Sequence, residues 1–300
     1  MIATTSATPD GEAPRGSLRP YRLWTPYLFV APGFAVLAVF VLAAMAQVIG
    51  YSFTDYNAFN AGRWVGLENY QRLMADDRFW FCLGNSFLYL LVTPVLMVLS
   101  LWAAMLVHAG LRFAWGLRMW LFFPVITPTI VAAIAWRVLL NEDSGLLNTM
   151  LGWVGVGAVN WLSERPFTLM SAMLVTMWKG FGYFMMVFLA GLVAIPRELE
   201  EAATVDGAGR VGRFVHVTLP GLRPVLVLVA LISSVSALKV FDELYVTIQG
   251  APISHQTAVP LIFNTAFDRG DFGLACAQGV VLFLVVLVFS MVQLRLGGDR

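Results

Sequence analysis

The sequence predicts an all-α integral membrane protein with six transmembrane helices and both termini in the cytoplasm. Of its 300 residues, 59% are hydrophobic and only 12% are charged, against roughly 45–50% and about 25% in soluble domains. The mean hydropathy is +0.77. The net charge of +1 gives no sign of a nucleic-acid-binding surface. This composition excludes a soluble globular protein and a disordered chain, because so few charges could not cover that much apolar surface.

Gaps between charged residues locate the helices, because about 20 mostly apolar residues are needed to cross roughly 30 Å of hydrocarbon. Five gaps are plain: Arg22 to Asp55, Arg78 to Arg112, Arg118 to Arg137, Arg165 to Arg197 with only Lys179 inside, and Asp271 to Arg295. A sixth helix begins at Pro224. Its uncharged run to Leu238 is too short to span, so we expect it to continue through Lys239 and Phe241 toward Tyr245. Kinks are predicted at three prolines, Pro94, Pro124 and Pro128.

The placement of arginine and lysine sets the orientation of these helices. With the N-terminus inside, 11 of the 19 basic residues lie in inner segments and 7 in outer ones, whereas the 18 acidic residues divide 7 and 11. The inner segments therefore carry +4 and the outer ones −4, which predicts cytoplasmic termini. We divide the chain into a cytoplasmic tail (1–23), the first transmembrane helix with its outer loop (24–80), and a core transmembrane domain (81–296). The tail is not read as a secretory signal, because the apolar run after it is too long.

The one large cytoplasmic connection, residues 196–224, has the pattern of two short helices at the membrane surface. Pro196 and the acidic residues after it suit the first turn of a helix, where carboxylates complement the dipole. Gly207 is a natural stop for that helix. A second helix is predicted from Arg210 to Thr218, ended by the Leu-Pro pair that follows. By itself, such a segment is an amphipathic surface connection between two spans.

The residues of this loop also resemble the EAA loop of binding-protein-dependent ABC importer permeases. That pattern is Glu-Ala-Ala, three residues, Gly, nine residues, Ile, one residue and Leu-Pro, and only Val217 departs from it by replacing the isoleucine. The loop's Asp-Gly-Ala stretch is similar to the carbohydrate branch of the family. The residues that this resemblance identifies as ATPase-coupling are Glu201, Ala202, Ala203, Asp206, Gly207, Val217, Leu219 and Pro220.

The resemblance extends from about Trp24 to Leu296. Residues 65–70 are similar to the family's V-G-L-x-N-[FY] stretch. Two further stretches resemble sugar-type permeases: Ala190-Gly191-Leu192 before Ile195-Pro196, and Phe241-Asp242 followed by Gly250-Ala251-Pro252. The family usually has Gly-Gly-Pro at the last of these. The resemblance implies the type I ABC importer fold, with 196–224 docking on a separate nucleotide-binding subunit.

The resemblance further implies the permease subunit of an ATP-driven importer of maltose/glycerol-phosphate type, for a sugar or a related polyol or sugar phosphate. Its implied partners are a second related permease subunit, two ATP-binding subunits and an extracytoplasmic solute-binding protein, all at the cell's inner membrane. A heterodimer of permeases is expected over a homodimer. The alternative function is a stand-alone secondary transporter or channel driven by an ion gradient.

ATP hydrolysis is expected to lie in a separate chain. A phosphate-binding loop needs Gly-Lys-Ser/Thr, and the only two lysines, Lys179 and Lys239, follow Trp178 and Leu238. ATP and magnesium are therefore assigned to the partner ATPase, with no cofactor in this chain. The three histidines are scattered and no span carries a paired-carboxylate or His-Glu-x-x-His motif, so we expect a non-catalytic subunit without a metal site.

Lys179 is the clearest candidate for the substrate pathway. In a helix over Phe167–Val193 it lies near the membrane midplane beside Trp178, and a charge at that depth is expected to face a partner or water. An aromatic face and a cation suit a sugar, and a structural ion pair is the alternative. We add Phe241, Asp242 and Tyr245 as candidates for the outer part of the pathway.

Two further side-chain groups have simpler interpretations. Lys239, Asp242 and Glu243 are spaced three and four apart, so on a helix they would neutralise one another locally. Cys82 and Cys276 are expected to be free thiols, with a disulfide as the alternative if the outer ends of their helices meet.

Overall fold

The computed structural model describes residues 24–60, 62–110, 114–248 and 252–298. The predicted tail 1–23 and most of the Gly-Ala-Pro motif at 250–252 lie outside them. The described residues form helices and no β-strand beyond two isolated bridges, which confirms the all-α prediction. The chain consists of two compact units, residues 1–47 and 48–300.

The first unit is the beginning of one long apolar helix. It comprises α1 (Thr25–Leu37), a π-helical turn (Ala38–Leu42) and the start of α2 (Ala43–Tyr51). The stretch Pro26–Tyr51 has a mean hydropathy of 2.5, and none of its most apolar window is buried inside the protein. A helix that is apolar on every side suits a hydrocarbon environment.

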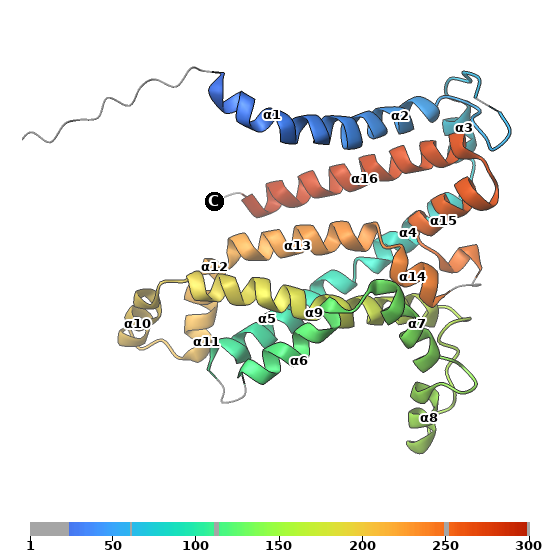
Figure 1. Cartoon of the computed structure of the whole chain (residues 1–300). Helices are drawn as coiled ribbons and strands as arrows, with labels where there is room; N and C mark the ends of the chain where they lie inside the picture. The colour runs from blue at the N-terminus through green and yellow to red at the C-terminus, as the bar shows by residue number, and fades with distance from the viewer. Residues whose placement is uncertain (1–23, 61, 111–113, 249–251, 299–300) are drawn as a thin grey trace, which may run out of the picture. The chain divides into compact units, whose positions relative to one another are not determined.

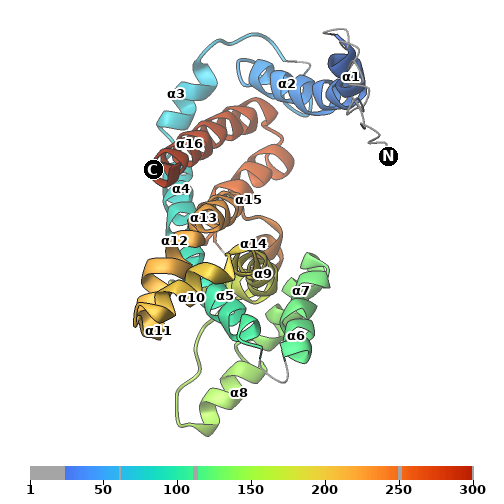
Figure 2. The ribbon, with the colours of Figure 1, turned by 90° about the vertical axis from the view of Figure 1, so that its left-hand side faces the viewer.

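The second unit is a helical bundle (Figures 1 and 2). Its elements up to the surface loop are α3 (Glu68–Met74), α4 (Asp77–Tyr89), α5 (Val92–His108), α6 (Ala114–Ile126), α7 (Thr129–Leu139), α8 (Leu146–Trp153) and α9 (Phe167–Ala194). They are followed by α10 (Arg197–Val205), α11 (Arg210–Arg213), the π-helical turn η2 (Phe214–Thr218), α12 (Leu219–Gly221), α13 (Arg223–Leu238), α14 (Asp242–Thr247), η3 (Ile253–His255), α15 (Ala258–Phe263), η4 (Asn264–Asp268) and α16 (Phe272–Gly298).

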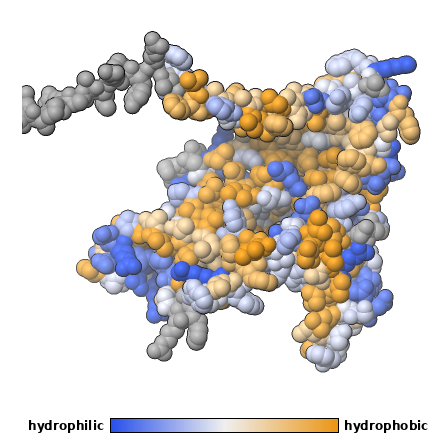
Figure 3. Space-filling model, viewed as in Figure 1, coloured by the Kyte–Doolittle hydropathy of each residue, from blue (hydrophilic) through white to orange (hydrophobic). Residues whose placement is uncertain are grey.

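Two apolar clusters form the core of the bundle. One joins α5, α9 and α13 around Leu96, Met185 and Phe188, and the other joins α4, α15 and α16 around Phe79 and Leu261. In Figures 1 and 2, α5, α9, α13 and α16 run side by side, with α10 and α11 at one end, called here the α10 end. The face in Figure 3 is largely apolar along these helices and hydrophilic over α10 and α11. This pattern matches a bundle that meets water at its ends.

Six candidate spans agree with the predicted number. Four single helices are long and apolar enough to cross a membrane, and two bent helix pairs bring the number among the described residues to six. One bent pair is α6 with α7, which meet at 98° next to Pro128. The second is the segment Arg210–Gly221 with α13, at 66°. Pro94 explains the break between α4 and α5, because it offers no N–H to the carbonyl of Leu90. Pro124 lies inside α6.

The prediction that the helix after Pro224 continues to Tyr245 is wrong. Helix α13 ends at Leu238, and α14 begins only at Asp242. A carbonyl freed in this break, that of Val240, accepts a hydrogen bond from the Thr257 hydroxyl at 3.4 Å. The break is therefore stabilised by a residue far along the chain, which the local sequence does not reveal.

The stretch 65–70 has a structural role that explains its pattern. Asn69, only 2% exposed, donates from Nδ2 to the carbonyl oxygens of Ser52 and Thr54 at 3.0 and 2.7 Å. The next residue, Tyr70, shares a 2.8 Å hydrogen bond with the Ser52 hydroxyl. This segment is tied to the start of α16 as well, because Gly273 packs directly against the carbonyl of Thr54.

We expect Asn69→Ala to destabilise the protein by about 1–3 kcal/mol, because one buried and one partly buried carbonyl lose their donor. Thermal unfolding of the purified protein in detergent measures this. Asn60→Ala, at an exposed position in the same segment, serves as the control and leaves the melting temperature unchanged. Equal melting temperatures for the two variants would contradict the role given to Asn69.

Candidate functional site

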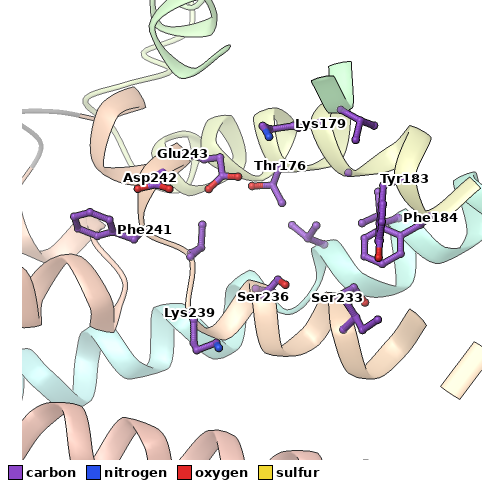
Figure 4. Close-up of a pocket in the computed structure, with 17 residues that line it drawn as sticks. Thr176, Lys179, Tyr183, Phe184, Ser233, Ser236, Lys239, Phe241, Asp242 and Glu243 are labelled. Carbon is purple, nitrogen blue, oxygen red and sulfur yellow. The ribbon is translucent and has the colours of Figure 1, made fainter. Parts of the chain in front are cut away.

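A cavity of about 570 Å³ lies inside the bundle, where α5, α9 and α13 meet the break before α14 (Figure 4). Its polar lining comes from α9, α13, the break after α13 and the first turn of α14. The side chains that give it chemical character are Thr176, Lys179, Tyr183, Ser233, Ser236, Lys239, Phe241, Asp242 and Glu243. It is a mostly apolar chamber with a few polar groups, as in small-molecule binding sites.

Three of the five predicted pathway residues line this cavity: Lys179, Phe241 and Asp242. Lys179 makes no ion pair within the described part of the chain, and the structure therefore gives no support to the structural-pair alternative. The Phe241 ring stacks on Tyr245 with 5.0 Å between centroids. Tyr245 therefore supports one wall from behind and is absent from the lining.

Trp178 lies away from the cavity. It lines a separate apolar groove of about 510 Å³ between α5, α6, α7 and α9, where its ring meets Trp136 edge to face at 5.9 Å. Neighbouring residues on an α-helix point about 100° apart, so Trp178 can face this groove while Lys179 faces the cavity.

The predicted local neutralisation of Lys239 by Asp242 and Glu243 is wrong. No ion pair joins them in the described residues, because the helix that would align them is broken at 239–241. In Figure 4, Asp242 and Glu243 lie on the side of Lys179 and Thr176, while Lys239 lies on the opposite side. The cavity therefore carries charges of both signs on separate walls.

Sequence reasoning missed several polar groups of the cavity. Thr176, Lys179, Gly180 and Tyr183 line it from α9 at helical spacings of three, four and seven. Thr176 is held by a 2.7 Å hydrogen bond to the buried Tyr89. The sequence contained a signal for these residues. A lysine in the middle of a span indicates which face of the helix meets the cavity, and residues three or four positions from it lie on that face.

The loop that resembles the EAA motif forms two helices at the α10 end, as predicted. Helix α10 follows Pro196 and carries acidic residues in its first turn. It ends at Val205, and Gly207 follows the C-cap residue with a φ of +81°, which suits glycine. The N–H groups of Gly207 and Ala208 bond back to Thr204 and Ala203 at 3.1 and 2.9 Å, which is the Schellman arrangement.

The second helix does not end at Leu219-Pro220. It continues through the π-helical turn into α12, which ends at Gly221. Pro220 lies in the first turn of α12, directly after the π-helical turn. Val217 and Leu219 are half-buried here, whereas Glu201, Ala202, Asp206 and Gly207 are exposed and Ala203 is intermediate.

A polar cluster fastens the opposite end of the bundle. Asn85 donates to the carbonyls of Ser254 and Gln256 at 3.0 and 2.8 Å and accepts from the Arg165 guanidinium at 2.8 Å. His255 lies 3.2 Å from the Thr168 hydroxyl. Partial burial, and then the charge of Arg165, lower the pKa of His255.

Both cysteines are free: Cys82 is buried and Cys276 half-buried. This confirms the expected free thiols. Cys82 instead donates to the carbonyl of Ile253 at 3.3 Å, which adds a contact between α4 and the segment before α15.

Comparisons with known proteins agree with this architecture. The chain is 32% identical to the trehalose/maltose transport system permease protein MalF of Thermococcus litoralis over 276 residues, 91% of this chain and 94% of that protein. It is 33% identical to the arabinooligosaccharides transport system permease protein AraP of Bacillus subtilis, over 91% and 88%.

A solved bacterial ABC transporter involved in the import of the acidic polysaccharide alginate has the same fold. The TM-score is 0.79 at 20% identity, over 91% of this chain and 95% of that one. A second alginate transporter structure, in complex with an alginate pentasaccharide-bound periplasmic protein, gives 0.78 at 21%, over 90% and 92%. Residues 96–296 match the family described as binding-protein-dependent transport system inner membrane components. The chain belongs to this family, and it is a multi-pass permease subunit of an ABC importer.

Proposed function

We propose that this chain forms half of the membrane pathway of an ATP-driven importer for a sugar or a related polyol or sugar phosphate. The observation that carries the proposal is the cavity around Lys179, in the same bundle that presents the EAA-type loop at one end. Hydroxyl and ammonium groups suit the hydroxyls of a sugar, and the rings of Tyr183 and Phe241 offer faces for its apolar side.

Coupling to ATP hydrolysis is assigned to the α10 end. Leu199 and Val205 on α10 are 53% and 88% exposed, and such apolar side chains in a short surface helix are suited to a partner protein. The partner is a separate ATPase with two ATP-binding subunits, which hold ATP and magnesium. This end and both termini then lie in the cytoplasm, in agreement with the charge bias of the sequence.

The remaining partners follow from the family. An extracytoplasmic binding protein delivers the solute to the opposite end of the bundle; the alginate transporter solved in complex with a periplasmic protein supports a partner of this kind. A second, related permease subunit completes the pathway as a heterodimer. The membrane is the cytoplasmic (inner) membrane, in keeping with the family's description as inner membrane components.

Reconstitution tests this function. The chain is co-expressed with the second permease and the ATPase encoded beside it, and the complex is placed in vesicles with the binding protein. Sugar uptake that needs ATP and the binding protein supports the proposal. Uptake by this chain alone, driven by a proton or sodium gradient, would instead establish the secondary transporter.

In this system we expect Lys179→Ala to raise the solute concentration for half-maximal ATPase stimulation by about 10-fold or more, as for one lost hydrogen bond to a charged group. The thermal stability should stay the same, because Lys179 has no ion pair to lose within the described residues. Lys179→Arg should retain part of the response. A normal solute response in Lys179→Ala, with a lowered melting temperature, would make this lysine a structural residue.

A further inference from the structure

A second cavity, of about 430 Å³, lies at the α10 end between the surface helices and the ends of two spans. Its walls come from four elements. His108 ends α5, Leu192 and Val193 belong to the last turn of α9, and the remaining wall is formed by α10 and α11. Its volume lies within the range of about 300–1,000 Å³ typical of small-molecule sites.

Charges of both signs face this cavity without neutralising one another. Arg197 and Arg213 line it together with Glu200 and Glu201. None of the four forms an ion pair in the described part of the chain. Arg213 donates one hydrogen bond, to the Thr204 hydroxyl at 2.9 Å, which leaves its other N–H groups available. The cavity thus offers two guanidinium groups and two carboxylates to a ligand that carries both charges.

The lining of the cavity passes from apolar residues at the end of α9 to charged residues on α10 and α11. Helix α9 ends at Ala194, and Val193 beside the cavity is 70% exposed and apolar. Directly beyond it come the charged residues of α10. Apolar residues next to charged ones match a phospholipid, whose acyl chains are apolar and whose headgroup is charged.

The cavity lies on one side of α10 and shares only Glu201 with the residues assigned to ATPase coupling. Its α10 residues, at 197, 200, 201 and 204, are spaced three, four and seven apart and share one side of the helix. Leu199 and Val205, the exposed apolar side chains of the coupling surface, do not line it. A ligand can therefore occupy the cavity while the other face of α10 is covered.

We propose that this cavity binds the headgroup of phosphatidylethanolamine. The phosphate accepts hydrogen bonds from Arg197 and Arg213, and the primary ammonium donates to Glu200, with the acyl chains along Val193. Basic pockets at this level bind anionic lipids, but the two carboxylates here disfavour a headgroup with no positive charge. The quaternary ammonium of phosphatidylcholine has no N–H to donate, so it forms a weaker contact.

Native mass spectrometry of the full chain tests the proposal. The protein in detergent is offered equal amounts of phosphatidylethanolamine, phosphatidylcholine and phosphatidylglycerol, and the retained lipids are counted. We expect phosphatidylethanolamine to be favoured about 10-fold over the other two, as for one charge-assisted hydrogen bond. Arg197→Gln should abolish the preference, whereas Arg210→Gln, an exposed arginine on α11 that does not line the cavity, should keep it.

A variant that binds a lipid more strongly distinguishes a specific effect from misfolding. Glu200→Gln removes a carboxylate and should increase the retention of phosphatidylglycerol, a result that loss of structure cannot produce. Equal retention of the three lipids by the unaltered protein, or a preference that survives Arg197→Gln, would overturn the proposal. If lipid retention is unchanged but Arg197→Gln weakens binding of the ATPase, the cavity belongs to that protein interface instead.

Discussion

Gly182→Ala is expected to lower the melting temperature by roughly 2–12 °C and to reduce the yield of folded protein. Gly182 is buried in α9 where α6 crosses it. A β-carbon at this position would overlap the carbonyl group of Leu121 and come within 3.0 Å of the Phe122 α-carbon. These are backbone atoms that no rotamer change can move, so the two helices must separate. Such overpacking typically costs about 1–3 kcal/mol, and 1 kcal/mol corresponds to roughly 2–4 °C in a domain of this size.

The matched control for this prediction is Gly116→Ala in α6. A β-carbon there meets no atom within 4 Å, and replacing glycine by alanine inside a helix is favourable by up to about 1 kcal/mol. Its melting temperature should therefore equal or exceed that of the unaltered protein. If Gly182→Ala behaved in the same way, the close approach of α6 and α9 would be wrong.

The coupling loop could be predicted because its information is local. The positions of Pro196 and Gly207 follow from the conformations that these two residue types favour, and the structure agrees with both. The number of spans could likewise be counted, because a charge-free run of sufficient length has few alternatives. The 98° bend beside Pro128 goes beyond the predicted kink, because a proline weakens a helix at a known place but does not set the angle.

The cavity could be predicted only in part because it depends on contacts between distant segments. Lys179 identified the right helix. The opposite wall could not be predicted, because it is formed at the break at 239–241, which is stabilised by a hydrogen bond from Thr257, 17 residues after Val240. No glycine or proline marks this break. A continuous helix was therefore expected, on which Lys239 would pair with Asp242 and Glu243. In the structure these residues lie on separate walls of the cavity. The separation of these charges within the cavity depends on tertiary contacts, so it could not be predicted from the local sequence.

Val205→Asp is expected to lower ATP-dependent uptake at least about 10-fold while leaving the fold intact. Val205 is 88% exposed at the last turn of α10, so the change removes no packing within this chain. In the proposed complex, docking of the ATPase would bury the new carboxylate in the interface. A hot-spot residue in such an interface contributes about 2 kcal/mol or more, which corresponds to roughly 30-fold in affinity.

Three measurements separate this effect from general damage. The melting temperature of the isolated chain should be unchanged by Val205→Asp, and the binding of the ATPase should weaken in parallel with uptake. Val205→Ile, which keeps an apolar side chain at the same position, should support normal uptake. If Val205→Asp transports at the normal rate, the exposed surface of α10 around Val205 is not where the ATPase binds, because a carboxylate cannot be buried in an apolar contact without a measurable loss.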